Sequence, residues 1–124
     1  MTTSNDLSRH ANDAAARFLE TRGYIIVQRD FETEAGGFPI IAWEDSRKET
    51  LVFVGVDVKK GLLPAETTTN RQICEAVAMS FLANFDECGM SLRFDNISLG
   101  ALDDDSRALL RHHINLSDFS SAVA

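Results

Sequence analysis

The stretch Leu51–Gly61, LVFVGVDVKKG, decides the fold of this 124-residue chain. Apolar residues and one glycine run up to Asp57, and two lysines and a glycine then end the run. A short apolar run rich in β-branched residues is typical of a buried strand. Because side chains alternate along a strand, every second residue from Phe53 to Lys59 is predicted to share one face. Asp57 and Lys59 then form either a catalytic carboxylate–lysine pair or only the polar end of the strand.

Helical and strand-like segments surround this stretch. The spacing of apolar residues predicts two amphipathic helices. Runs rich in β-formers predict further strands, and Pro39 should lie at a strand start, an edge or a bulge. Residues 104–115 begin like a capped helix but also fit a strand, so both readings stay open. The helices are expected over residues 7–21 and 70–85, and the other strands over 24–31, 38–43 and 91–99. This order predicts one α/β domain over residues 1–124, with a mixed sheet flanked by helices.

Composition limits the classes of function. The chain has 19 acidic and 12 basic residues and a net charge of −7, whereas nucleic-acid binders usually carry a basic face. Charge therefore argues against strong DNA binding. Cys74 and Cys88 are too few and too far apart for a zinc site or a disulfide framework. No apolar run approaches a membrane span, and the polar N-terminus lacks the apolar middle of a signal peptide. We expect a cytoplasmic protein with no membrane segment.

Five segments, taken together, resemble a known family. They are ANDAAARFLETRGYIIVQRDF (11–31), LVFVGVDVK (51–59), NRQICEAVAMSFLA (70–83), LRFDNISL (92–99) and HHINLSDF (112–119). Their order and spacing resemble the YraN-like family, small bacterial proteins with a restriction-endonuclease-like fold. The resemblance implies the order α-β-β-β-α-β-β, and it favours a strand in the region 104–115.

The resemblance also implies a site. Family members resemble metal-dependent nucleases of the PD-(D/E)xK type, in which carboxylates on adjacent strands hold a divalent cation. In this chain the family's acidic positions fall on Asn12, Gly37, Pro39 and Gly55. We therefore expect a catalytically degenerate nuclease fold that acts by binding a protein partner, its own copy or, weakly, nucleic acid. In this reading the chain needs no cofactor and is not an enzyme.

A competing hypothesis keeps an active site. Asp57-x-Lys59 reproduces an acid-x-lysine pair, shifted two residues along the strand. A bulge at Gly36-Gly37 would bring Glu34 inward as a second carboxylate. The chain would then be a DNA endonuclease or resolvase-like enzyme, with Mg²⁺ or Mn²⁺ bound by Asp57 and Glu34.

The remaining candidates concern cations and core residues. His112 and His113 are adjacent, so on a strand they point to opposite faces, and together with His10 they are expected at the surface. Cys74 is expected to be a small buried hydrophobe. Trp43, Phe38 and Phe53 are expected to be core or sheet-face residues. The candidates for phosphate contacts are Arg29, Lys59, Lys60 and Arg71, with Arg22 and Arg93 as further members.

Overall fold

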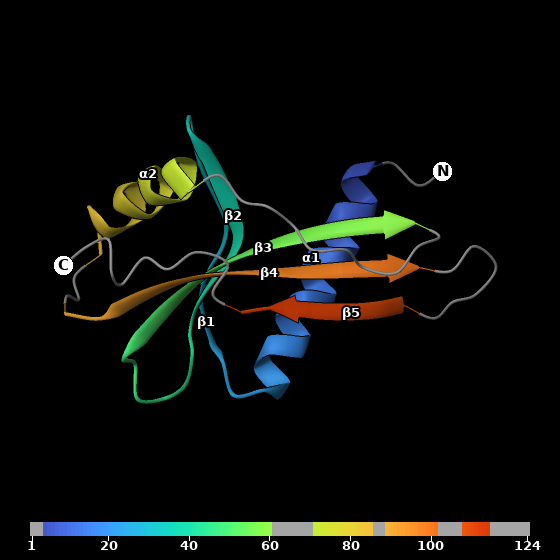
Figure 1. Ribbon diagram of the computed structural model, residues 1–124, viewed down its shortest axis with the longest axis horizontal. Helices are drawn as coiled ribbons and strands as arrows, with labels where there is room; N and C mark the ends of the chain where they lie inside the picture. Colours follow the sequence, from blue (N-terminus) through green and yellow to red (C-terminus); the bar gives the residue numbers. More distant parts are fainter. Residues whose placement is uncertain (1–3, 61–70, 86–88, 102–107, 115–124) are drawn as a thin grey trace.

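The structure is a computed structural model of the 124-residue chain, and it describes residues 4–60, 71–85, 89–101 and 108–114. In these residues, two helices and five strands follow one another in the predicted order, so the α/β class is confirmed (Figure 1). The segment 104–115, for which both a helix and a strand were considered, contains the strand β5 (Ala108–His113). The elements are α1 (Ser4–Thr21), β1 (Ile25–Thr33), β2 (Gly36–Trp43), β3 (Thr50–Lys60), α2 (Arg71–Leu82), β4 (Ser91–Ala101) and β5 (Ala108–His113).

The five strands form one mixed sheet in the order β1-β2-β3-β4-β5. The pair β3–β4 is parallel, and the other three pairs are antiparallel. A parallel pair needs a long crossover, and the connection that contains α2 supplies it. Within this sheet β1 and β5 are the two edge strands.

Two apolar clusters pack against the two helices. In Figure 1 the strands β3, β4 and β5 pass in front of α1, while α2 lies toward the other end of the molecule. The predicted core residues Trp43, Phe38 and Phe53 are buried, as expected, in the cluster beneath α2. Alternate residues of β3 face the other way, so Val52 and Val54 belong to the cluster against α1.

The β1–β2 hairpin is irregular, and this irregularity shapes the candidate site. The pairing register shifts between Ile26 and Gln28. Asp30 has a φ of 54°, a left-handed conformation that Asp tolerates better than most residues. Pro39 precedes the first β2–β3 pair, at Ile40, so it lies where β2 pairs with β1 alone. This place suits a residue without an N–H donor.

Candidate functional site

A cavity of about 250 Å³ lies between α1, the β1–β2 hairpin and β3. Three of the four positions at which the resemblance places acidic ligands line it, namely Asn12, Gly37 and Pro39. Val56 also lines it, and since neighbouring side chains on a strand alternate, Gly55 and Asp57 face away. The fold therefore gathers three of the implied positions around one cavity. The lining also contains two acidic residues, Asp30 and Glu32, and the aromatic residue Phe38.

At two of the implied ligand positions a side chain would meet neighbouring atoms. A Cβ on Gly37 would overlap the carbonyl oxygen of Phe31 and lie 3.0 Å from the Cα of Glu32. A Cβ on Gly55 would lie 2.8 Å from Oδ1 of Asn96. At Gly37 the obstacle is backbone, and at Gly55 it is a buried side chain. A glutamate at either position therefore requires its neighbours to move.

Asp57 belongs to a polar row on the face of the sheet opposite the cavity. Asn96 Nδ2 donates a hydrogen bond to Asp57 Oδ2 at 3.2 Å and contacts Ser98 Oγ at 3.3 Å. Asn96 and Ser98 are buried, whereas Asp57 is half-buried. One neighbour of Asp57 is thus a carboxamide on β4. The side chain of Lys59, the other member of the proposed pair, lies outside the described part.

Asp30 and Glu32 are the acids that sequence reasoning missed. Both are exposed and line the cavity, while Glu34 is exposed at the hairpin turn and is not among the lining residues. The signal was present in the sequence as an acid-x-acid pair on a strand. In the described part of the chain, no group of three or more His, Cys, Asp or Glu side chains is arranged to hold a metal ion. The four implied positions bring no carboxylate, so they do not supply the ligand set that the resemblance implies.

The cations proposed for phosphate contacts are in part already engaged. Arg29 Nη2 lies 2.8 Å from Asp13 Oδ1, and this hydrogen bond holds the pKa of Asp13 below its usual value. Arg29 thus compensates an acid on α1. The side chains of Lys59, Lys60 and Arg71 lie outside the described part of the structure.

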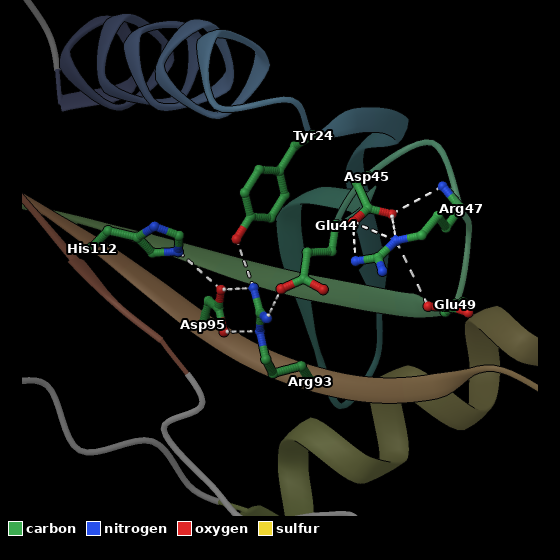
Figure 2. Close-up of polar contacts among 8 residues, drawn as sticks. All are labelled: Tyr24, Glu44, Asp45, Arg47, Glu49, Arg93, Asp95 and His112. Atoms are coloured by element: carbon green, nitrogen blue, oxygen red, sulfur yellow. Dashed lines mark hydrogen bonds and ion pairs between the residues drawn. The ribbon is translucent and has the colours of Figure 1, made fainter.

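Arg93 is the centre of a half-buried ionic network (Figure 2). Its guanidinium donates to both carboxylate oxygens of Asp95, at 3.0 and 2.9 Å, to Tyr24 Oη at 2.6 Å, and to Glu44. Burial lowers the pKa of Arg93, but the hydrogen bonds and charges of Asp95 and Glu44 outweigh this effect and raise it overall. Arg93 is therefore committed to structure.

His112 closes this network from the edge strand. Its Nε2 lies 2.9 Å from Asp95 Oδ2, and only 11% of the side chain is exposed. The expectation of a surface position was wrong for His112, because the carboxylate on the neighbouring strand satisfies its ring nitrogen inside the fold. A carboxylate only accepts hydrogen bonds, so Nε2 carries the hydrogen. His113 pairs with Asn96 on the opposite face, as the alternation predicted.

Two smaller expectations concern cysteine and the membrane. Cys74 is buried, as predicted, and burial raises the pKa of its thiol to about 11. Cys88 lies outside the described residues. Among the helices that the structure describes, none is long and apolar enough to span a membrane.

Fold and cavity define an α/β protein with one mixed sheet and a polar cavity between the first helix and the first hairpin. Comparison with known sequences then gives the family. The pattern of the uncharacterised protein family UPF0102 matches residues 11–99, and the chain belongs to this family, which confirms the YraN-like resemblance.

Several UPF0102 proteins are similar over most of their length. One from Chlorobaculum tepidum is 32% identical over 114 residues, covering 87% of this chain and 85% of the relative. One from Nocardia farcinica is 36% identical over 98 residues, covering 75% of each. One from Treponema pallidum is 39% identical over 92 residues, covering 68% of this chain and 70% of the relative.

Proposed function

We propose that this chain acts by binding, as a UPF0102 member with a restriction-endonuclease-like fold that has lost metal-dependent catalysis. The observation that carries the proposal is steric. At Gly37 and Gly55, even a Cβ meets backbone or a buried side chain. A carboxylate side chain at either position would therefore need neighbouring atoms to move.

The replacements also make energetic sense. A half-buried carboxylate without a metal costs more free energy than a glycine or a hydrogen-bonded amide at the same place. Asn96 occupies the space above Gly55 and hydrogen-bonds Asp57. Asn96 thereby supplies a neutral hydrogen-bond donor to the Asp57 carboxylate.

The partner that fits best is a protein. Net charge of −7 disfavours the phosphate backbone of nucleic acid. Arg29 and Arg93, two of the cations proposed for phosphate contacts, form ion pairs with acids of this chain. Nucleic acid is therefore at most a weak ligand in this proposal.

Metal binding and cleavage test the proposal directly. Labelled branched and single-stranded DNA is incubated with the protein and Mn²⁺, and Mn²⁺ binding is followed by calorimetry. We expect no cleavage and no saturable binding of the metal. Gly55→Glu alone should not create a metal site, because Asn96 fills the space. Mn²⁺-dependent cleavage that depends on a carboxylate of this chain would refute the proposal.

A second candidate function is a divalent-metal-dependent DNA endonuclease. One observation favours it: Asp30 and Glu32 line the same cavity as three implied ligand positions. One or two carboxylates can suffice for Mg²⁺ when substrate phosphates add ligands. Loss of cleavage in Asp30→Asn and Glu32→Gln would assign the activity to this cavity. Loss in Asp57→Ala would instead assign it to the shifted Asp57–Lys59 pair.

A further inference from the structure

We propose that the free edge of β1 receives an extended segment of a partner protein in which apolar and basic side chains alternate. This inference rests on the proposed function, binding without catalysis, and it names the surface and the chemistry of the partner. The two faces of the edge strand β1 offer different surfaces to such a segment.

An added strand needs an edge strand to pair with, and β1 is one. Among the described strands, β1 pairs with β2 alone, so the outer side of its nine residues has no strand partner there. An exposed strand edge is a template for a further strand, and main-chain hydrogen bonds supply affinity in such complexes.

The face of β1 toward α2 offers an apolar groove of about 430 Å³. Val27 and Phe31 line it from β1, and Phe81 and Phe85 line it from α2 and the turn that follows. The rings of Phe31 and Phe81 meet edge to face, with 5.3 Å between their centres. This fixed aromatic floor suits an apolar side chain of the incoming strand.

The opposite face of β1 offers negative charge. Asp30 and Glu32 are exposed there and line the 250 Å³ cavity. Neither is found in an ion pair with another described residue, whereas the neighbouring Arg29 is held by Asp13. Asp30 has a left-handed backbone and lines the cavity together with α1, and Arg29 contacts Asp13 of α1, so Asp30 and Arg29 both lie toward this helix. This face suits Lys or Arg of the partner.

The two faces together specify the partner segment. Side chains of an added strand point alternately to the two sides of the sheet. Apolar residues would then enter the groove beside Phe31, and basic residues would approach Asp30 and Glu32. The apolar face and the acidic face together therefore require apolar and basic residues to alternate along the partner segment.

Charge also selects the edge and the partner. The other edge strand, β5, carries the exposed Arg111, which would repel a basic segment. A second copy of this chain also carries a net charge of −7, so self-association would bring like charges together. A basic partner is attracted to β1, and attraction of this kind steers both encounter and register.

Synthetic nine-residue peptides test the proposal with the full-length protein. The probe alternates Lys with Val or Phe and carries blocked ends and a fluorophore. One control has the same composition with all the lysines grouped at one end, and another alternates Glu with the apolar residues. We expect saturable binding of the alternating basic peptide, measured by anisotropy, and much weaker binding of both controls. Equal binding of the grouped peptide would overturn the proposal.

Matched variants locate the site. Glu32→Lys should weaken binding about threefold to tenfold, because an exposed attractive pair becomes repulsive. Glu34→Lys makes the same charge change at an exposed position outside the cavity and should change binding less than twofold. Equal effects of the two variants would mean non-specific attraction and would overturn the site.

The apolar groove has its own pair of variants. Ser80 is exposed and lines the groove, so Ser80→Trp should fill it and reduce binding at least tenfold. Met79 is 65% exposed on the same helix but does not line the groove, so Met79→Trp should bind like the wild type. Both variants are checked for folding by circular dichroism. If folded Ser80→Trp still binds the peptide, the groove is not part of the binding site.

The outcomes separate this inference from the proposed function. Absence of peptide binding, with no Mn²⁺-dependent cleavage, would reject the β1 site and leave binding elsewhere as the function. Cleavage that is lost in a carboxylate variant would reject the proposed function itself.

Discussion

Arg93→Met is expected to cost about 3 to 5 kcal/mol of unfolding free energy, as is typical when one partner of a buried ion pair is removed. Asp95 is 0% exposed and Arg93 14% exposed. The substitution leaves the Asp95 carboxylate inside the fold with His112 as its neighbour, and Tyr24 and Glu44 lose their donor. Domains of this kind have about 5 to 15 kcal/mol in total, so the variant should be marginally stable.

Urea unfolding measures this cost. Trp43 is the sole tryptophan and is buried, so its fluorescence reports the transition. With a urea dependence of about 1 to 3 kcal/mol per molar, the midpoint should fall by at least about 1 M. The matched control is Arg47→Met. Its guanidinium lies 2.7 Å from Asp45 but is 70% exposed (Figure 2), so the urea midpoint should stay close to that of the wild type.

The expected cost of Arg93→Met depends on the burial of its ion pair with Asp95. Arg93→Met with a cost as small as that of Arg47→Met would show that the network contributes no more than a surface pair. The double variant Arg93→Met with Asp95→Asn should recover part of the loss, because the buried carboxylate that lost its Arg93 partner is then replaced by a neutral amide. If the double variant is no more stable than the single one, packing rather than charge dominates.

Three further outcomes are expected. Lys48→Gly should stabilise the protein by about 0.5 to 1 kcal/mol in urea unfolding, because Lys48 has a φ of 58°, a conformation that costs a non-glycine residue free energy; Lys48→Ala should give no gain. In Cys88→Ala, the Cys74 thiol should stay unreactive toward a thiol reagent at pH 8 until urea unfolds the protein, because burial raises its pKa to about 11; fast reaction in the native state would contradict this. Because the pKa of Asp13 is lowered by Arg29 from its ordinary value of 3.8, the stability that this pair contributes is present above that value and lost as pH falls through the lower folded one. Arg29→Gln should therefore reduce the urea midpoint at pH 7, and the reduction should shrink as the pH falls below 3.8.

Local patterns predicted most of the fold. The order of elements, the burial of Phe53 and Trp43 and the opposite faces of His112 and His113 follow from periodicity along the chain, which neighbouring residues alone determine. The segment 104–115 was undecided because its local signals conflict. Pairing of β5 with β4, from Asn96–His113 to Ala101–Ala108, makes it a strand.

The site was less predictable. Alignment with the family indicated that Asn12, Gly37, Pro39 and Gly55 lack acids, and the sequence alone supports that statement. Whether a carboxylate has room at Gly37 or Gly55 depends on Phe31 and Asn96, which belong to other strands.

Charge pairing, too, depends partly on the sequence and partly on the tertiary structure. The sequence by itself determined the composition, the net charge and the alternation of faces, because each is a property of the chain or of its local period. Only the tertiary structure decided that Arg93 is bound by acids, that His112 is buried against Asp95, and that Asp30 and Glu32 meet at one cavity. The physical reason is that hydrogen bonds, burial and steric room depend on residues far apart in the chain, and packing alone brings these together.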